Sequence, residues 1–337
     1  MKRFLQLDLI RTIAIALVIF QHCWSIIDLD IPAQTFSYHG YRGLIYGVPL
    51  FVMLSGFFQL NSKVKSTGSY LGGRFKRLLP PFFIWMIVTY AISVYVHKYD
   101  EISSVGDAFR LFVPFFLTNK VNEAFWYIFM ISGLYLVTPF LQRALSNNEN
   151  SRKLLEYGLI LWAGWLLLSD FLPQFELLKQ FPIAGKFLGY YLAGFYACSY
   201  MNDRSLNIKV GLIAFVVSYG LNVFLMYQGF QLVTLEAIEV VSAFIVLKSV
   251  RMDEGSEKLN TVITRISRYS YTIYLTHFIF IRLFYTYLPD YFPVHWATPI
   301  YTTLLVLVVE YFFCRVLEWI PFIPDKLVGI SPKKKTT

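Results

Sequence analysis

The stretch LDLIRTIAIALVIFQHCWS, residues Leu7–Ser25, is a membrane-length apolar run that carries Asp8, Arg11 and His22. It predicts a spanning α-helix, because about 20 mainly apolar residues cross the roughly 30 Å hydrocarbon core of a bilayer. On a helix that turns about 100° and rises about 1.5 Å per residue, Arg11 and His22 share one face and lie about 16 Å apart along the axis. If Arg11 lies near the membrane surface, His22 lies deep inside, where an ionisable side chain indicates a functional site.

Each of these side chains also has a simpler structural interpretation. An arginine one turn into a first helix can extend to the membrane surface and set the topology. A lone histidine can form a hydrogen bond to a neighbouring helix. The position of Asp8, Arg11 and His22 on one stripe favours a shared functional role.

The rest of the chain repeats this apolar pattern. Of its 337 residues, 56% are hydrophobic and 15% are charged, a composition too apolar for an ordinary soluble domain. Apolar runs alternate with short polar segments, which predicts an all-α, polytopic transmembrane helical bundle of about ten spanning helices. The runs lie near residues 7–27, 42–60, 79–97, 123–141, 154–171, 183–200, 210–228, 233–249, 269–287 and 297–316. A short interfacial helix is expected at 107–116.

The basic residues set the predicted topology. Lysine and arginine collect in alternate connections, so the positive-inside rule places both termini in the cytoplasm. As a multi-pass helical protein, the chain is expected among the lipids of the cell inner membrane. This asymmetry also explains the net charge of +9, and no basic pattern interleaved with aromatics indicates a nucleic-acid partner. The three cysteines lie unpaired in apolar runs, so neither a disulfide framework nor a metal site is expected. Residues 1–320 are predicted to form one membrane domain, and residues 321–337 a short basic cytoplasmic tail.

A basic block precedes the third apolar run. In the segment LGGRFKRLLPPF, Arg74 and Arg77 are three residues apart, on one face of a helix, and Lys76 lies between them. The proline pair at residues 80 and 81 suits the start of a helix. Arginine forks bind phosphate in a bidentate manner, so this block can hold a phosphate-bearing ligand at a cytoplasmic mouth. It can equally contact anionic lipid headgroups, as ordinary positive-inside loops do.

Two more polar features lie inside predicted helices. Ser55 and Gly56 form a small, close-approach spot in the second helix, which favours helix packing over a catalytic serine. Ser270, Tyr274 and His277 follow at spacings of four and three residues, on one helical face. This polar face can line a cavity in the bundle, or it can hold helices together through hydrogen bonds.

Together these stretches resemble the acyltransferase-3 family of integral membrane acyltransferases, especially its single-domain branch of bacterial surface-polysaccharide O-acetyltransferases. The resemblance covers nearly the whole chain and rests on blocks that occur in the family's order. In the first helix, ten residues separate Arg11 from His22, and Asp8 precedes both. The second and third blocks are FVMLSGF (51–57) and the set Arg74, Arg77 and Pro80. The last two are Trp126 and Tyr127 at the start of the fourth helix, followed by GLYLVTP (133–139), and SYTIYLTH (270–277). Thr12 departs from the glycine that follows the arginine in many members.

The resemblance implies a reaction and a set of site residues. The protein would take an acyl group, most often acetyl, from cytoplasmic acyl-coenzyme A and place it on a hydroxyl of a glycan or lipid-linked sugar presented from the other side, without a metal. Arg11, His22, Arg74 and Arg77 match the family's functional motifs. Longer relatives carry an extracellular esterase-like domain that this chain lacks, so either its membrane domain completes the transfer or a separate partner does.

The residues themselves indicate how such a transfer would proceed. Apolar surroundings favour a neutral His22 imidazole, which can act as general base to the sugar hydroxyl or carry the acyl group itself. Arg11 is too far away to touch the same reacting atom, so it is expected to bind a phosphate or the start of the pantetheine arm. The expected phosphate ligands are Arg74, Lys76 and Arg77, and the candidates to line the cavity are Asp8, which orients Arg11, and Trp126, Ser270, Tyr274 and His277.

A transporter or flippase of a glycan precursor or small metabolite is the competing class, because it would also carry charges in its helices. Such a protein usually shows paired half-structures or helices broken near the midplane, and the sequence shows neither. Within the enzyme class, succinyl and longer acyl groups stay open as alternatives to acetyl, and the oligomeric state stays open too.

Overall fold

The computed structural model describes residues 4–27, 46–62, 66–97, 102, 104–118, 120–146, 150–172, 182–252, 256–292, 297–322 and 324–332. Within these ranges the chain is helical and contains no β-strand, so the all-α prediction is confirmed. Some of the basic residues behind the topology prediction, at positions 2, 3, 42, 63, 65, 98, 179 and 333–335, lie outside the described residues.

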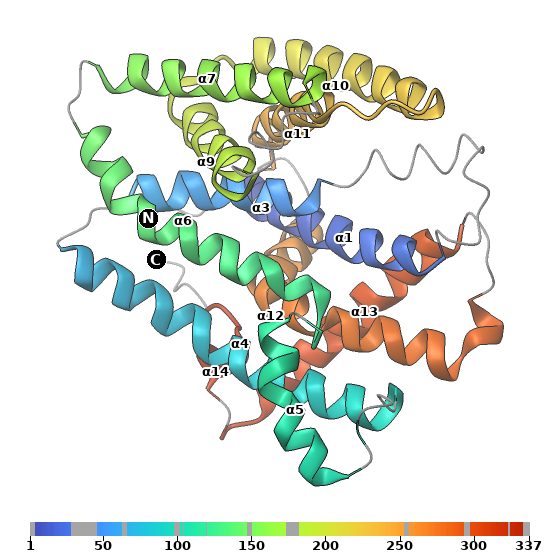
Figure 1. Cartoon of the computed structure of the whole chain (residues 1–337). Coiled ribbons are helices and arrows are strands. Elements are labelled where there is room, and N and C mark those ends of the chain that lie inside the picture. The colour runs from blue at the N-terminus through green and yellow to red at the C-terminus, as the bar shows by residue number, and fades with distance from the viewer. Residues whose placement is uncertain are drawn as a thin grey trace.

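Every predicted apolar run contains a helix, and the short helix expected near 107–116 is also present (Figure 1). The helices are α1 (Leu5–Ile27), α3 (Gly47–Leu60), α4 (Thr67–His97), α5 (Val105–Leu117), α6 (Trp126–Ala144), α7 (Ser151–Phe171), α9 (Pro182–Tyr200), α10 (Arg204–Tyr227), α11 (Val233–Lys248), α12 (Glu257–Tyr287) and α13 (Thr298–Trp319). Two 3₁₀ turns, η2 (Glu123–Phe125) and η3 (Pro289–Tyr291), precede α6 and follow α12, and the short α14 (Asp325–Val328) follows α13.

Six of the described helices are long and apolar enough to cross a membrane, namely α1, α4, α6 with η2, α7, α10 and α13. α3 is apolar but has 14 residues, and α11 has 16. Apolar side chains such as Ile160 of α7 and Val216 of α10 are exposed, as expected where lipid covers the surface. The protein is therefore a multi-pass helical membrane protein. The count of about ten spans and the cytoplasmic termini stay predictions.

α1 occupies a central place in the bundle, in contact with α3, α12 and α13. It runs in the same direction as α12. This follows from two contacts, since Arg11 contacts Ser267 in the first part of α12 and His22 contacts His277 further along it. The polar stripe predicted on α1 therefore faces α12 at both ends. Its ionisable side chains are directed to the protein interior, where membrane proteins place such groups.

α12 and α13 run antiparallel and are joined by buried polar contacts. Arg268 Nη2 lies 2.7 Å from Glu318 Oε1, and the Thr276 hydroxyl donates to the fully buried Glu310 carboxylate at 2.7 Å. These partners explain how α12 can carry the Thr276 hydroxyl and the Arg268 guanidinium inside the bundle, because polar groups in a membrane helix are tolerated when neighbouring helices satisfy them.

Glycines allow α3 and α9 to approach each other closely. A Cβ atom on Gly56 would lie 1.8 Å from the carbonyl oxygen of Tyr191, and one on Gly194 would lie 2.0 Å from the carbonyl oxygen of Met53. The backbones therefore touch at two points where no side chain fits. The close helix approach predicted at Gly56 is confirmed.

The proline pair at residues 80 and 81 lies inside α4, so the prediction that it starts the helix was wrong. α4 begins at Thr67, and membrane helices tolerate interior prolines when neighbouring groups take up freed backbone carbonyls. Separately, the Tyr271 hydroxyl of α12 donates to the Leu78 carbonyl at 2.6 Å and ties α4 to α12. The basic block is thus an integral part of a continuous helix. α12 likewise begins before its predicted run, at Glu257.

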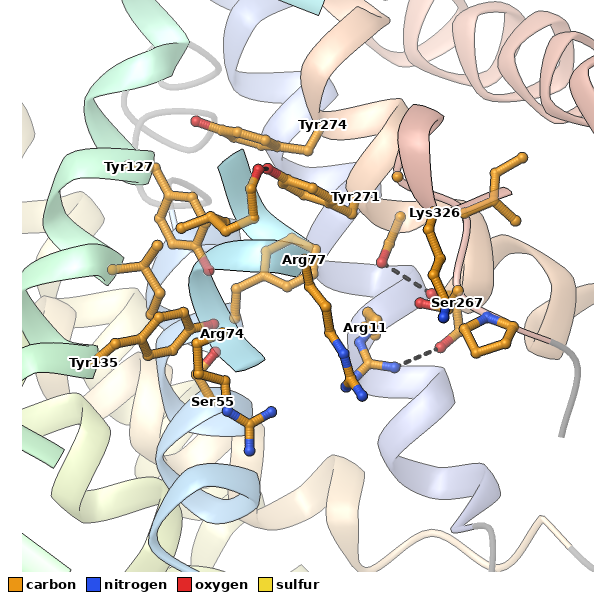
Figure 2. Close-up of a pocket in the computed structure, with 18 of the residues that line it drawn as sticks. Arg11, Ser55, Arg74, Arg77, Tyr127, Tyr135, Ser267, Tyr271, Tyr274 and Lys326 are labelled. Carbon is orange, nitrogen blue, oxygen red and sulfur yellow. Dashed lines mark hydrogen bonds between the residues drawn. The ribbon is translucent and has the colours of Figure 1, made fainter. Parts of the chain in front are cut away.

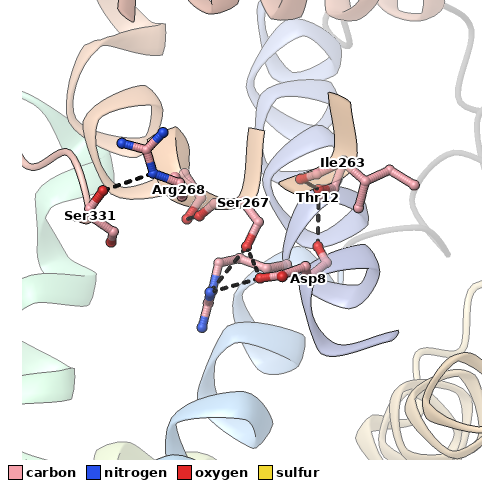
Figure 3. Close-up of polar contacts among 8 residues, drawn as sticks. Asp8, Thr12, Ile263, Ser267, Arg268 and Ser331 are labelled. Carbon is pink, nitrogen blue, oxygen red and sulfur yellow. Dashed lines mark hydrogen bonds and ion pairs between the residues drawn. The ribbon is translucent and has the colours of Figure 1, made fainter. Parts of the chain in front are cut away.

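Residues 324–332, which we call the C-terminal strap, follow α13 and pack back against the bundle. The strap contains α14, which contacts α4 and α13. Its Ser331 forms a reciprocal pair of hydrogen bonds with Arg268 of α12: Arg268 Nε donates to the Ser331 carbonyl at 3.0 Å, and the Ser331 N–H donates to the Arg268 carbonyl at 3.1 Å (Figure 3). The strap thereby comes to lie beside the first part of α12.

Candidate functional site

A cavity of about 470 Å³ lies among α1, α3, α4, α6, α12 and the strap (Figure 2). Its lining is rich in cations and hydroxyl groups, and none of the described residues that line it is acidic. The basic lining residues are Arg11, Arg74, Arg77 and Lys326, and the hydroxyl-bearing ones are Ser55, Tyr127, Tyr135, Ser267, Ser270, Tyr271, Tyr274 and Ser331. Such a lining attracts an anionic ligand.

Arg11 is held in place by contacts with its own helix and with α12. Its Nη1 donates to Ser267 Oγ at 3.1 Å and lies 3.6 Å from Asp8 Oδ1, and Ser267 Oγ in turn donates to Asp8 Oδ1 at 2.6 Å. Nearby, the Thr12 hydroxyl donates to the Ile263 carbonyl at 3.2 Å (Figure 3). The Arg11 side chain remains 29% exposed. It is therefore oriented by protein contacts while still open to the cavity.

The other cations enter from α4 and from the strap. Arg74 and Arg77 share one face of α4, and the Arg74 guanidinium lies 5.1 Å from the ring centroid of Tyr70. Lys326 belongs to α14 of the strap. Figure 2 shows the arginine head groups at the opposite end of the cavity from Tyr274. Because guanidinium forks match phosphate oxygens, this basic end suits a phosphorylated ligand.

Tyrosine rings form the other end of the cavity. Tyr127 of α6 and Tyr274 of α12 meet edge to face, with ring centroids 5.2 Å apart. The Tyr274 hydroxyl donates to the Ala124 carbonyl, and the Tyr271 hydroxyl donates to the Leu78 carbonyl at 2.6 Å. With their hydroxyls engaged in this way, Tyr271 and Tyr274 present mainly ring surface to the cavity. This end is aromatic, in contrast to the basic end.

Two histidines lie beyond Tyr274. The His277 ring is fully buried, 6.0 Å from the Tyr274 ring and 5.2 Å from the His22 ring between centroids. His277 Nδ1 lies 3.0 Å from the Ile273 carbonyl oxygen, which only accepts, so Nδ1 carries the proton of the neutral ring. The remaining nitrogen, Nε2, is buried and has no hydrogen-bond partner in the part of the chain that the structure describes. The histidine pair is thus adjacent to the cavity but behind its aromatic end.

The cavity brings together some of the residues expected from the sequence and leaves others outside. Those on its wall are Arg11, Arg74, Arg77, Ser270 and Tyr274. Asp8 lies behind Arg11, and His22 and His277 lie behind Tyr274. Lys76 is exposed and off the wall, because a two-residue step turns it about 200° around α4 from Arg74. Trp126 is 40% exposed and packs against Phe187, since it lies about 100° around α6 from the lining residue Tyr127.

Several lining residues were not predicted as site residues. One stripe of lining residues lies on α3 at spacings of three and four, namely Val48, Phe51 and Ser55. A second stripe lies on α6 at spacings of four, namely Tyr127, Ile131 and Tyr135. These helical stripes are visible in the sequence and would have placed Ser55 on one face of α3 and both tyrosines on one face of α6. Lys326 has no such signal, because it reaches the cavity only through the path of the strap.

Fold and site together define a class: an integral membrane protein whose helices enclose an anion-attracting cavity beside a buried histidine pair. The chain belongs to the acyltransferase-3 family, since the family's acyltransferase domain matches residues 4–314. The protein is therefore a membrane acyltransferase. The comparisons with curated proteins and with solved structures find no match to this chain.

Proposed function

We propose that the protein transfers an acyl group, acetyl in the first place, from cytoplasmic acyl-coenzyme A to a hydroxyl of a cell-surface or lipid-linked glycan. The observation that carries this proposal is the convergence of Arg11, Arg74, Arg77 and Lys326 on one cavity, with no acidic side chain among its described lining residues. Coenzyme A carries its phosphates at one end and its thioester at the end of a flexible arm. The cavity has the matching polarity, with cations at one end and aromatic rings at the other.

The donor would bind with its phosphates at the basic end and its pantetheine arm along the tyrosines. Arg11 and His22 are about 16 Å apart along α1, so one group can bind a phosphate while the other works at a distant acyl group. Tyr274 stands between the cavity and His277. In this proposal the thioester reaches the histidines when the Tyr274 ring turns aside.

At the histidine pair, His22 would accept the proton of the sugar hydroxyl as its oxygen attacks the thioester carbonyl. The carbon–sulfur bond breaks, the carbon–oxygen ester bond forms, and the proton passes from the imidazolium to the coenzyme A thiolate. In a two-step route, a His22 nitrogen attacks the thioester carbonyl and expels the coenzyme A thiolate, which takes the imidazolium proton. The sugar hydroxyl then attacks the acyl-imidazole, the ester forms, and the hydroxyl proton returns to the imidazole. Both routes require neutral His22 and give the same products.

The test is turnover of labelled acetyl-coenzyme A by the purified protein in nanodiscs. We expect free coenzyme A from the wild type and a rate lower by about 10²- to 10⁴-fold for His22→Ala, which lacks the proton acceptor or acyl carrier. Arg11→Ala should raise KM for the donor. Arg265→Ala is the matched control, because Arg265 is an arginine of α12 that contacts Tyr311 and does not line the cavity.

The competing class gives a different result in the same preparation. A folded wild type that neither binds nor turns over acetyl- or succinyl-coenzyme A contradicts the proposal. Movement of a labelled sugar or sugar lipid across vesicles, without consumption of any acyl-coenzyme A, would establish a transporter or flippase instead. A trapped acyl-protein that disappears with His22→Ala would identify the two-step route.

A further inference from the structure

The C-terminal strap contributes to the cavity although it lies outside the family match. The match ends at residue 314, whereas Lys326 and the backbone turn from Gly329 to Pro332 line the cavity. The strap therefore lies beyond the matched residues and still contributes to the basic end of the site.

The strap is anchored through its backbone. Trp85 Nε1 of α4 and the Thr272 hydroxyl of α12 both donate to the Val328 carbonyl, at 3.1 and 2.8 Å. Arg268 and Ser331 add the reciprocal pair of hydrogen bonds at the far end. Because none of these bonds uses the Lys326 side chain, the strap keeps its position when that side chain is changed.

A glycine allows the strap to follow its path so close to α12. Gly329 has φ of 92°, which favours glycine, and a Cβ atom there would lie 3.0 Å from a ring carbon of Tyr271. Val328 and Ile330 on either side are buried. The turn is therefore packed into the bundle, and it holds α14 and its lysine at the mouth of the cavity.

We infer that Lys326 binds a phosphate group of the acyl donor together with Arg74 and Arg77, so that the strap is part of the donor site. This inference rests on the proposed function. Lys326 is exposed at the mouth and forms no ion pair with any residue that the structure describes. A lysine ammonium is a compact charge on a flexible stem, suited to follow a phosphate beside two more rigid guanidinium groups.

A lipid headgroup at the cytoplasmic surface offers the same phosphate chemistry, so the donor and the lipid must be separated by experiment. The variants are Lys326→Gln, Arg74→Gln and the matched control Lys258→Gln, which removes the same charge from an exposed position on α12 away from the cavity. The donors are acetyl-coenzyme A and acetyl-pantetheine, which lacks the phosphates. Each variant is assayed in nanodiscs of purely zwitterionic lipid and in nanodiscs that contain anionic lipid.

We expect Lys326→Gln to raise KM for acetyl-coenzyme A about tenfold in both lipids, as for the loss of a charge-assisted hydrogen bond. Its KM for acetyl-pantetheine and its kcat should equal those of the wild type, and Lys258→Gln should change nothing. An unchanged KM in Lys326→Gln beside a raised KM in Arg74→Gln overturns the inference and leaves the proposed function intact. An equal rise for both donors would show a purely structural role, and an effect confined to anionic lipid would show a headgroup ligand. A wild type without turnover refutes the proposed function itself.

Discussion

Ser267 is the residue that joins Arg11 to Asp8, since its hydroxyl accepts a hydrogen bond from the one and donates to the other. Ser267→Ala removes both bonds with little change in volume. We expect KM for acetyl-coenzyme A to rise roughly fivefold, in line with the net worth of a hydrogen bond, because Arg11 is no longer held toward the cavity. Steady-state kinetics in nanodiscs measure this effect.

A second serine provides the control for that prediction. The Ser242 hydroxyl donates to the Ile238 carbonyl at 2.6 Å within α11, and Ser242 does not line the cavity. Ser242→Ala should keep the wild-type KM. If both serine variants shift KM equally, the effect comes from general loosening of the bundle and not from Arg11.

At the residue scale, the sequence was sufficient where one helix decides the geometry. The three-residue spacing of Arg74 and Arg77 was enough to put both on one wall, and the spacing of Ser270 and Tyr274 did the same on α12. The same rule, applied to Lys76, turns it away from that wall. Lys326 depends on hydrogen bonds from distant helices to the strap backbone, and no local pattern encodes these.

The contact between α3 and α9 gives a prediction about pairs of helices. Gly56→Ala places a methyl group against the Tyr191 backbone, which cannot move without displacing α9. We expect the free energy of unfolding to fall by about 1–3 kcal/mol, as is typical of overpacking, and the unfolding temperature in detergent to fall with it. Gly133→Ala on α6 meets no heavy atom within 4 Å and should be neutral or slightly stabilising. Equal unfolding temperatures for the two variants would contradict this packing.

The strap anchors give a second prediction at this scale. Trp85→Phe combined with Thr272→Val removes both donors to the Val328 carbonyl and leaves the aromatic and branched shapes nearly unchanged. We expect faster hydrogen exchange across the strap, including the Ser331 amide, and a raised KM for acetyl-coenzyme A. Each single variant should show less than half of the effect, because the other donor still holds the carbonyl. Unchanged exchange in the double variant would contradict the anchoring.

Helix positions were easier to predict from the sequence than helix ends. Each predicted apolar run contains a helix. However, α4 and α12 both start earlier than their runs, at Thr67 and Glu257. The added turns are polar or basic and are stabilised by tertiary contacts, such as the Thr12 hydroxyl bond to the Ile263 carbonyl, which hydropathy does not register. The proline pair misled the prediction because it lies inside α4, and membrane helices tolerate interior prolines that the rule for helix starts does not anticipate.

For the whole molecule, the shared cavity predicts that both chain ends lie on one side of the membrane. Arg11 near the start of α1 and Lys326 in the strap line the same cavity. Together with the positive-inside rule, this supports the prediction that both ends lie in the cytoplasm. Epitope tags at the two termini should both be inaccessible to antibody in intact spheroplasts and accessible after permeabilisation. A tag that is accessible at one end only would contradict the topology.

The charge of the cavity makes donor binding sensitive to salt. Four cations line the cavity, and the acidic group described beside them, Asp8, lies behind Arg11, so the lining forms a positive field that ions screen over about 10 Å at 0.1 M salt. KM for acetyl-coenzyme A should therefore rise several-fold between about 0.05 and 0.5 M salt, while KM for acetyl-pantetheine stays constant. A parallel rise for both donors would indicate an effect on the fold and not on phosphate binding.

The aromatic end of the cavity also bears on proton leakage across the membrane, and so on the proton gradient that supplies the cell with energy. A water-filled cleft that opened from one face of a membrane onto a pair of histidines, and from there to the other face, would conduct protons. The packed rings of Tyr127 and Tyr274 stop the cavity short of that pair. In the proposed transfer they would act as an electrical insulator, because an acyl group would pass this layer while the proton gradient across the membrane is kept.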